Sequence, residues 1–375
     1  SISEDDACDL LREFSEEEVW RAINELGKEK APGPDGFNIA FFQHCWSIVK
    51  QDVMGLFSEF HSKGVFEKSL NATFICLIPK VAGAKDINKF RPISLVRSVY
   101  KILAKVLATR LRGVVGKVVS PSQHAFVPGR HIMDASLIAN ECIDHCLKTN
   151  HLGILCKLDI EKAYDHVSWE FVMAILEKMG FPSKWRSWIF FCISTVRFSV
   201  LINGEASGFF PSSRGLRQGD PLSPLLFILV MEALSKLVYK ACEAGLLEGF
   251  QVGNHRSRDL LVSHLLFADD TLIFCRPCES DLGYLRCVLL LFEAMSGLRV
   301  NLSKSSIIPI GEIPNIQQLA SFFDCGVSAL PSTYLGLPLG ASFKSKAVWD
   351  PVVERFQKRL TGWKSKMLSK GGRLT

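Results

Sequence analysis

The spacing of apolar and polar residues divides this chain into strand-like and helix-like stretches. Residues 263–275 have apolar runs on both sides of Ala-Asp-Asp, which predicts two short strands joined by a turn that carries Asp269 and Asp270. Strands are also predicted over residues 73–78 and 153–160, with a hairpin at Asn203-Gly204. Apolar residues at helical spacing predict helices in residues 1–30 (ending at Gly27), 37–61, 99–115, 131–147, 168–180, 224–245 and 280–296, and from Ala347 onward.

The order of these elements predicts an α+β fold, in which helices cover one face of a small antiparallel sheet. The chain has 375 residues and 48% hydrophobic content, which suffices for one large or two ordinary domains. No internal repeat or low-complexity linker interrupts it.

No segment has the composition of a membrane span or a secretory signal. The first 20 residues are acidic, and no uncharged apolar run reaches the ~18 residues that a membrane helix needs. The longest such run, residues 222–231, predicts a buried helix. The chain begins at Ser1 and stops within a basic stretch, so we expect a fragment of a longer protein.

The 12 cysteines lie in apolar segments, which favours reduced thiols in an intracellular protein. Cys275 and Cys278 form one Cys-x-x-Cys pair, and Cys142 and Cys146 lie four apart. Neither pair has the second pair that a zinc site needs, so packing in the core is the expected role.

Basic residues are concentrated in two blocks, although the net charge is only +6. Residues 80–130 contain eleven Lys or Arg against one acid, and residues 344–373 contain nine against two. Such blocks indicate surfaces that follow a polyanion, and ordinary solvated helix faces are the alternative. In the predicted helix 99–115, four basic residues are expected on the outside, available to phosphates: Lys101, Lys105, Arg110 and Arg112.

Three carboxylates end or join predicted strands. Asp269 and Asp270 are adjacent anions in a turn where Asn-Gly or Asp-Gly is usual. Asp159 follows an apolar strand, where an unpaired buried acid is costly. A solvated turn and a turn cap are the structural alternatives. Together the three carboxylates could hold two Mg²⁺ ions, and with the basic blocks and a glycine-rich loop at 215–221 they predict phosphoryl transfer on nucleic acid.

Longer motifs follow one another along the chain, beginning with Lys30-Ala-Pro-Gly-Pro-Asp-Gly36. The others are Phe90-Arg-Pro-Ile-Ser-Leu95, Gln123-His-Ala-Phe-Val-Pro-Gly-Arg130, Lys157-Leu-Asp-Ile-Glu-Lys-Ala-Tyr-Asp165, Gly215-Leu-Arg-Gln-Gly-Asp-Pro-Leu-Ser-Pro224, Phe267-Ala-Asp-Asp270, Asn301-Leu-Ser-Lys304 and Tyr334-Leu-Gly-Leu-Pro-Leu339. In this order they resemble the reverse transcriptase of non-LTR (LINE-type) retrotransposons, most closely those of plants.

The resemblance implies a right-hand polymerase fold with fingers, a palm built on a small antiparallel sheet backed by helices, and a partial thumb. It implies an N-terminal helical extension in residues 1–64 and basic fingers in residues 65–150. The palm would occupy residues 151–310, with a finger-side insertion near 170–212. Residues 311–375 would be the palm end and the start of a truncated basic thumb. The family's endonuclease and carboxy-terminal segments are not expected within these residues.

The resemblance also assigns roles to residues. Two Mg²⁺ ions, with Mn²⁺ as an alternative, would be held by Asp159, Ile160, Asp269 and Asp270. The catalytic set would be Asp159, Asp269, Asp270 and Lys304, the last matching a lysine proposed to protonate pyrophosphate. The incoming dNTP would contact Lys80, Arg91, Ile160, Tyr164 and Gln218. The template or primer would contact Lys101, Arg130, Gly219, Leu335 and Gly336.

The roles expected of Tyr164 and of the loop around Gln218 have a chemical reason. Tyr164 matches the aromatic residue that excludes a 2′-hydroxyl and so selects deoxynucleotides; a buried core tyrosine is the alternative. Gly215 and Gly219 flank Gln218 and would let the main chain come close to the substrate.

The implied function is RNA-templated DNA synthesis. Its partners would be an RNA template, a DNA primer or nicked target DNA, and dNTPs, with no membrane partner. Nuclear action is a family expectation. Two alternatives remain open: a group II intron-type maturase with the same palm, and an inactive relic that binds nucleic acid without catalysis. The presence of all three aspartates favours the enzyme.

Overall fold

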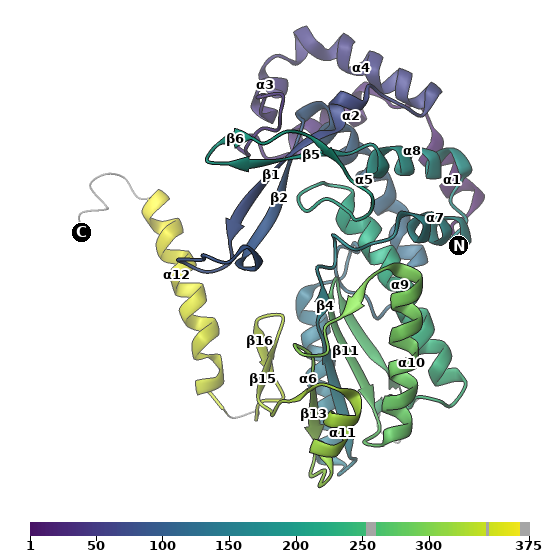
Figure 1. Cartoon of the computed structure of the whole chain (residues 1–375), viewed down its shortest axis with the longest axis vertical. Coiled ribbons are helices and arrows are strands. Elements are labelled where there is room, and N and C mark those ends of the chain that lie inside the picture. Colours follow the sequence, from purple (N-terminus) through teal and green to yellow (C-terminus); the bar gives the residue numbers. More distant parts are fainter. Residues whose placement is uncertain (253–259, 343–344, 368–375) are drawn as a thin grey trace. The chain divides into compact units, whose positions relative to one another are not determined.

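The chain divides into two compact units (Figure 1). In this computed structural model, residues 1–252, 260–342 and 345–367 are described, residues 361–367 by their backbone alone. The first unit comprises Ser1–Arg130, Ile160–Leu237 and Cys287–Val300. The second comprises His131–Asp159, Val238–Arg286 and the described residues from Asn301 onward. Two helices, α9 (Ser223–Glu243) and α10 (Glu279–Ser296), contribute residues to both units.

The first unit begins with two capped helices. Residues 1–30 were predicted as one helix but form two, because Ser3 caps α1 and the Ser15 hydroxyl accepts the Glu18 N–H at 3.2 Å to begin α2. The helices of the first unit, apart from its shares of α9 and α10, are α1 (Glu4–Leu11), α2 (Glu16–Glu25), α3 (Ile39–His44), α4 (Trp46–Lys63), α5 (Ser98–Val118), α7 (Trp169–Lys178) and α8 (Ser183–Ser194), with 3₁₀ turns at Lys68–Asn71 and Ile87–Lys89.

The sheet of the first unit has the order β2-β1-β5-β6, with β7 also paired to β5. Strands β1 and β2 form an antiparallel hairpin, whereas β1 and β5 run parallel. Asn203 and Gly204 both have positive φ between β5 and β6, which confirms the predicted hairpin. The strands are β1 (Ala72–Pro79), β2 (Phe90–Val96), β5 (Arg197–Ile202), β6 (Glu205–Ala206) and β7 (Phe210–Pro211), and a separate pair is β4 (Ile160–Glu161) with β12 (Arg299–Val300).

The proline- and glycine-rich turn at residues 30–36 anchors the start of α5. A Cβ on Gly33 would lie 2.5 Å from the carbonyl carbon of Val96, so only glycine permits this approach. One carboxylate oxygen of Asp35 accepts the Ser98 N–H at 2.7 Å and caps α5 from a distant part of the sequence. The first of the motifs therefore joins the N-terminal helices to the junction between β2 and α5.

The second unit is built on a five-stranded sheet of order β10-β11-β3-β13-β14. All neighbours in this sheet are antiparallel except β13 and β14. The strands are β3 (Gly153–Leu158), β8 (Phe250–Val252), β9 (Leu260–Val262), β10 (His264–Phe267), β11 (Asp270–Cys275), β13 (Ser306–Ile310), β14 (Gly326–Val327), β15 (Ser332–Tyr334) and β16 (Leu337–Leu339), and the helices are α6 (Ile132–Lys148), α11 (Ile316–Phe323) and α12 (Asp350–Met367), with a 3₁₀ turn at Ala347–Trp349.

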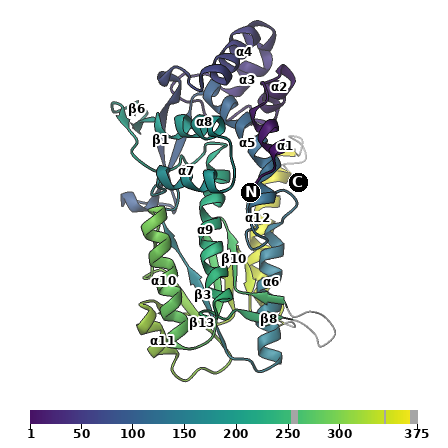
Figure 2. The ribbon, with the colours of Figure 1, turned by 90° about the vertical axis from the view of Figure 1, so that its right-hand side faces the viewer.

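Both faces of this sheet are buried. On one face, Leu155 of the central strand packs in a cluster with Ala139 and Ile143 of α6. Its neighbours Ile154 and Cys156 point to the other face and are also buried. Figure 2 shows α6 and α11 on opposite sides of the sheet. The α+β class is confirmed, but the expectation that helices cover one face was wrong, because both sides of the central strand are apolar.

All twelve cysteines are free. Burial raises the pKa of the Cys142 thiol to about 12, which keeps it protonated within the core. Among the described helices, none combines the length and apolar composition needed to cross a bilayer. The predicted basic tail helix is present as α12. Part of the second basic block, residue 344 and residues 368–373, lies outside the described residues.

Candidate active site

Asp159 and the pair Asp269–Asp270 come together at one end of two neighbouring strands. Strands β3 and β11 pair antiparallel, and their last registered pair is Leu158 with Thr271. Asp159 and Asp270 each lie one residue from this pair, at the same end of the sheet. The structure therefore brings together the ends of the two strands that the sequence predicted over residues 153–160 and 263–275.

Asp269 lies in the tight turn between β10 and β11, which Phe267 and Asp270 close as a registered pair. Ala268, the first central residue of the turn, has φ of 56°. A left-handed conformation costs a non-glycine residue about 1–2 kcal/mol, so the neighbouring structure holds this turn in place. Asp159, Asp269 and Asp270 are all exposed to solvent.

The pKa of Asp270 is raised above the ordinary value of an aspartic acid. Partial loss of hydration is the largest cause, even though solvent reaches the side chain, and the negative charges of Asp269 and Asp159 add to it. The positive charge of Lys157 opposes the rise. Three carboxylates that repel one another suit a divalent cation, because oxygen ligands are those that Mg²⁺ prefers. In the part of the chain that the structure describes, no three His, Cys, Asp or Glu side chains are already gathered as a metal site.

A turn at residues 301–305 fixes the main chain of Asp159. The Asn301 N–H donates to the Asp159 carbonyl at 2.8 Å, and the Asp159 N–H donates to the Ser305 hydroxyl at 3.1 Å. The Ser305 hydroxyl in turn donates to the Asn301 carbonyl at 2.8 Å. Lys304 is exposed on this turn, next to Ser305. Sequence reasoning missed Asn301 and Ser305, although the motif that contains Lys304 was the signal.

Leu335 and Gly336 form the tip of the hairpin between β15 and β16, and both have positive φ. Asn140 of α6 supports the hairpin, since its amide oxygen accepts the Gly340 N–H at 2.8 Å. The Gly336 carbonyl accepts a hydrogen bond from Arg355 of α12 at 2.8 Å. A contact of this tip with nucleic acid stays a prediction.

In the first unit, the glycine-rich loop is held against protein main chain. Gly215 has φ of 87°, and a Cβ there would lie 2.5 Å from the Asp165 carbonyl oxygen. A Cβ on Gly219 would lie 3.1 Å from the Ser94 carbonyl oxygen. The Ser94 N–H also donates to the Gln218 carbonyl at 2.8 Å. These glycines therefore permit close approach between main-chain segments of the protein, which is a structural reason for them in addition to any approach to a substrate.

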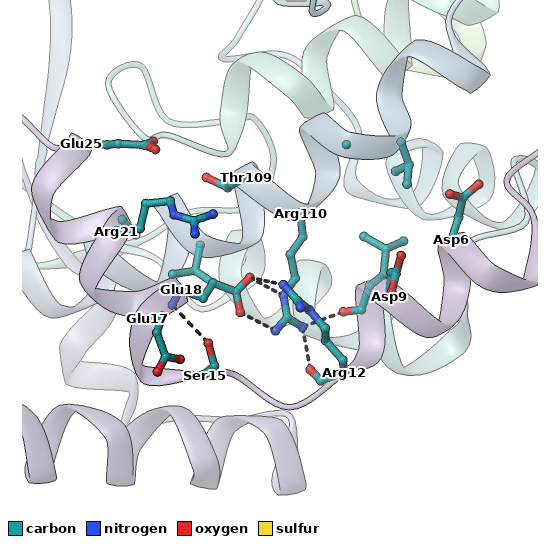
Figure 3. Close-up of a pocket in the computed structure, with 15 residues that line it drawn as sticks. Asp6, Asp9, Arg12, Ser15, Glu17, Glu18, Arg21, Glu25, Thr109 and Arg110 are labelled. Atoms are coloured by element: carbon teal, nitrogen blue, oxygen red, sulfur yellow. Dashed lines mark hydrogen bonds and ion pairs between the residues drawn. The ribbon is translucent and has the colours of Figure 1, made fainter.

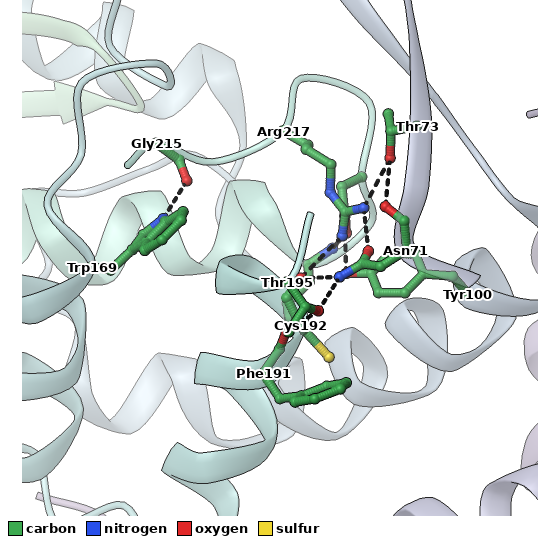
Figure 4. A network of polar contacts seen from close by, with 11 residues as sticks. Asn71, Thr73, Tyr100, Trp169, Phe191, Cys192, Thr195, Gly215 and Arg217 are labelled. Carbon is green, nitrogen blue, oxygen red and sulfur yellow. Dashed lines mark hydrogen bonds and ion pairs between the residues drawn. The ribbon is translucent and has the colours of Figure 1, made fainter. Parts of the chain in front are cut away.

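A buried polar network centred on Arg217 anchors this loop (Figure 4). The Arg217 side chain donates to the Asn71 amide oxygen at 2.6 Å and pairs with Asp220 at 2.7 Å. Its guanidinium lies 4.1 Å from the ring centre of Tyr100, whose hydroxyl donates to Asp220 at 2.9 Å. Arg217 and Asp220 are only 5% and 3% exposed. Sequence reasoning missed this network, and the only signal was an arginine and an aspartate on either side of Gln218-Gly219.

Two predicted dNTP contacts, Tyr164 and Gln218, lie next to or within this loop, and the Leu216 N–H donates to the Tyr164 carbonyl at 2.7 Å. Tyr164 is half-buried, and its ring stacks on Phe227 at 4.8 Å. The Gln218 amide nitrogen lies 3.5 Å from a carboxylate oxygen of Asp165. Burial raises the pKa of Asp165, and the contact with Gln218 acts in the opposite direction. The Ile160 side chain is buried, so this residue can reach a ligand only through its main chain.

Lys80 and Arg91 lie near the end of the β1–β2 hairpin. The Lys80 ammonium donates to the Asn88 carbonyl at 3.0 Å within the hairpin loop. Arg91 is exposed and pairs in register with Ile78. The hairpin thus presents Arg91 to solvent, and Lys80 is partly engaged in its own loop.

Arg130 and Lys101 have surroundings that the sequence did not reveal. Burial lowers the pKa of Lys101 from its usual value. The guanidinium of Arg130 donates to main-chain carbonyls of Val119, Ser120 and Gln123. Arg130 therefore holds this turn together, and contact of either residue with template or primer stays a prediction.

Three bases of the first basic block pair with acids of the N-terminal helices, and Figure 3 shows one of them, Arg110, with Glu18. Arg110 is 8% exposed and forms two hydrogen bonds with Glu18, at 2.7 and 2.8 Å. Lys105 pairs with Glu25 at 2.7 Å. The expectation that Arg110 is available on the outside of its helix was wrong, because α1 and α2 pack against α5 and their acids lie opposite its bases. A pocket of about 460 Å³ remains between these helices.

The mixed α+β fold and the carboxylates at the ends of paired strands are consistent with a polymerase. Residues 78–339 match the family described as "Reverse transcriptase (RNA-dependent DNA polymerase)", and the chain belongs to this family. The family implies nucleic acid binding and the use of a divalent metal.

Two relatives come from mobile elements. The chain is 28% identical over 360 residues to the "Transposon TX1 uncharacterized 149 kDa protein" of Xenopus laevis, covering 95% of this chain and 27% of that protein. It is 28% identical over 351 residues to the Pol polyprotein of retrotransposable element R2DM of Drosophila melanogaster, covering 89% and 32%. The chain thus spans about a quarter to a third of the length of these relatives.

A solved structure of apo telomerase from Candida tropicalis is similar in fold. The TM-score is 0.50 at 14% sequence identity, over 82% of this chain and 60% of that chain. At this identity the likeness concerns the fold alone.

Proposed function

We propose that this chain is the reverse transcriptase region of a non-LTR retrotransposon and extends a primer 3′-hydroxyl with deoxynucleotides on an RNA template. The observation that carries the proposal is the arrangement of Asp159 and Asp270 at the same end of β3 and β11, with Asp269 in the adjoining turn. In this proposal residues 151–310 provide the palm, and the hairpin of β1 and β2 belongs to the fingers. The helix α12 begins the thumb.

The carboxylates fit a pair of Mg²⁺ ions, since all three offer oxygen ligands. Burial, and after it the negative charges of Asp269 and Asp159, raise the pKa of Asp270, and a cation would relieve this repulsion. Asp159 and Asp269 would be the main ligands, with Asp270 and the main chain of Ile160 in support. When bound, the ions would lower the pKa of the primer hydroxyl and neutralise charge on the triphosphate.

The remaining roles belong to side chains of the protein. Arg91 and Lys80 bind the triphosphate, where a guanidinium can engage phosphate oxygens bidentately. Tyr164, held by its stack on Phe227, lies under the sugar and excludes a 2′-hydroxyl. Gln218 contacts the nucleotide, and Lys304 donates a proton to the pyrophosphate as it leaves.

The network around Arg217 gives Gln218 its fixed position in this proposal. Asp220 and Asn71 hold the guanidinium from two sides. Because Gln218 is the next residue, its main chain has little freedom. An origin in a plant element and action in the nucleus rest on the resemblance of the motifs alone.

Primer extension tests this function. A labelled DNA primer is annealed to an RNA template, and extension is followed with dNTPs or NTPs, in Mg²⁺ or in EDTA. We expect extension only when both dNTPs and Mg²⁺ are present, and none with NTPs or in EDTA. Binding of the hybrid without any extension would contradict the proposal and indicate a relic that only binds nucleic acid. Equal use of NTPs would contradict the role of Tyr164.

A further inference from the structure

Lys157 is the one charged residue in β3, the central strand of the second unit's sheet. It pairs with Leu272 on one side and with Ser306 on the other. A lysine is unusual between apolar strand residues. Burial of its stem stabilises the fold only if the ammonium reaches water or a hydrogen-bond partner.

The ammonium of Lys157 reaches the hairpin of β15 and β16. Its nitrogen donates to the Thr333 carbonyl at 2.8 Å, across 176 positions of sequence. Thr333 belongs to the strand that leads to Leu335 and Gly336 at the tip. An ammonium has three N–H donors, and this bond uses one of them.

The strand register places Lys157 on the face of the sheet that carries Asp270. Leu272 lies opposite Lys157, and Asp270 lies two residues before Leu272 on β11. Side chains two apart on a strand share one face, so Lys157 and Asp270 are diagonal neighbours on the same face of the sheet. Diagonal pairs lie roughly 7–8 Å apart, which a lysine side chain can span.

Tyr334 provides an independent sign that the hairpin lies against this face. Its side chain is buried in the cluster that contains Leu155 and Leu272. Its hydroxyl has no hydrogen-bond partner among the described residues. Burial raises the pKa of Tyr334, and the negative charge of Asp270 raises it further. The Tyr334 hydroxyl on the hairpin therefore lies within range of the Asp270 charge.

We propose that Lys157 is a positioning residue that ties the β15–β16 hairpin to the carboxylate end of the sheet, so that a primer end held at Leu335 and Gly336 is presented to Asp270 and its neighbours. This inference rests on the proposed polymerase function. A lysine is suited to the task because its flexible stem reaches the Thr333 carbonyl while its positive charge acts on Asp270.

The test uses the whole chain with Lys157→Met, Lys157→Arg and the control Lys148→Met, whose lysine is exposed and paired with Asp144 on α6. In steady-state extension, we expect Lys157→Met to raise the KM for primer–template roughly tenfold or more, the effect of losing a charged hydrogen bond. The KM for dNTP changes less than about twofold, since the dNTP contacts are retained. Lys157→Arg keeps most of the affinity for primer–template.

A second measurement needs neither catalysis nor metal. Fluorescence anisotropy in EDTA gives the Kd for the labelled hybrid, which we expect to rise by a similar factor in Lys157→Met. Hydrogen exchange at the amides of Leu335 and Gly336 should become faster in the same variant. If Lys157→Met does not fold, Lys157→Leu takes its place, because leucine also lacks both the charge and the N–H donors that hold the Thr333 carbonyl.

The outcomes separate the two proposals. If the native chain does not extend a primer, the polymerase function fails, while exchange at the hairpin still tests the tie to Lys157. If Lys157→Met matches Lys148→Met in Kd, in primer–template KM and in exchange, the inference is overturned. A rise confined to the KM for dNTP would overturn it as well.

Discussion

Replacing Arg217 by methionine tests whether the buried network holds the glycine-rich loop. Methionine keeps most of the stem but removes the guanidinium, which pairs with Asp220 at 2.7 Å and with the Asn71 amide at 2.6 Å. Asp220, which is 3% exposed in the native chain, would keep only the Tyr100 hydroxyl and the Leu222 N–H as donors. The variant therefore leaves a buried charge without its counter-charge.

The expected loss of stability is large. Breaking a buried ion pair by removing one partner costs about 3–5 kcal/mol. For a cooperative unit of the size of the first unit, each kcal/mol lowers Tm by about 2–4 °C, so Arg217→Met should melt roughly 6–20 °C below the native chain. Lys63→Met is the control, because Lys63 pairs with Glu59 at 2.7 Å on an exposed helix face, where such pairs contribute about 0–1 kcal/mol.

Calorimetry at neutral pH measures these shifts, and a double variant gives the coupling. Arg217→Met with Asp220→Asn removes both charges, so it should be more stable than the sum of the single changes predicts. The KM for dNTP of any folded Arg217→Met protein should rise, since Gln218 loses its support. A Tm of Arg217→Met equal to that of Lys63→Met, or strict additivity in the double variant, would refute the reasoning.

Two further predictions concern the first unit. The hydrogen bond from Lys117 lowers the pKa of Asp6 to about 2, so its charged form stabilises the fold above the ordinary pKa of 3.8, and this contribution is lost as the pH falls towards 2. Asp6→Asn should thus lower Tm at pH 7, and the difference in Tm from the native chain should vanish between about pH 4 and 2. A difference in Tm that does not change with pH would contradict the pairing of Asp6 with Lys117. Gly215→Ala should cost more than about 1 kcal/mol in urea unfolding, because its Cβ meets the Asp165 carbonyl at φ of 87°. Gly55→Ala, in a helix with open space around it, should stabilise by about 0.5–1 kcal/mol, and equal effects at the two glycines would contradict the steric argument.

The carboxylate site was predictable because its signals are local. An apolar run, two aspartates and another apolar run give a hairpin at Asp269 and Asp270, and the strand before Asp159 has the same apolar pattern. These strands pair because their main-chain N–H and C=O groups need hydrogen-bond partners when they are buried. The Ser15 cap and the Asn203-Gly204 turn were predictable for the same reason.

The electrostatics of α5 were not predictable from local counts. The excess of bases in residues 80–130 is real, but the acid that pairs with Arg110 is Glu18, 92 positions earlier. A count within a window cannot reveal a partner outside it. Lys157 and Thr333 are a still more distant pair. The Lys157 ammonium donates to a main-chain carbonyl, and a carbonyl is present at every residue, so no sequence pattern marks it.

Arg217 illustrates a further limit. Its neighbours Gln218 and Gly219 stand out because the motif is glycine-rich, whereas a single arginine in a loop does not indicate a buried ion pair. Only the fold reveals that Asn71, Tyr100 and Asp220 surround it. Burial of a charge is a property of packing among segments that lie far apart in the chain.

The most direct test of the central claim compares the native chain with Asp159→Asn and Asp269→Asn in single-turnover primer extension on an RNA template, with hybrid binding measured in parallel. Each variant should bind the hybrid as the native chain does but lose extension by roughly 10³-fold, since several kcal/mol of transition-state stabilisation is removed. Extension by either variant at the native rate would contradict the assignment of these carboxylates as the catalytic centre.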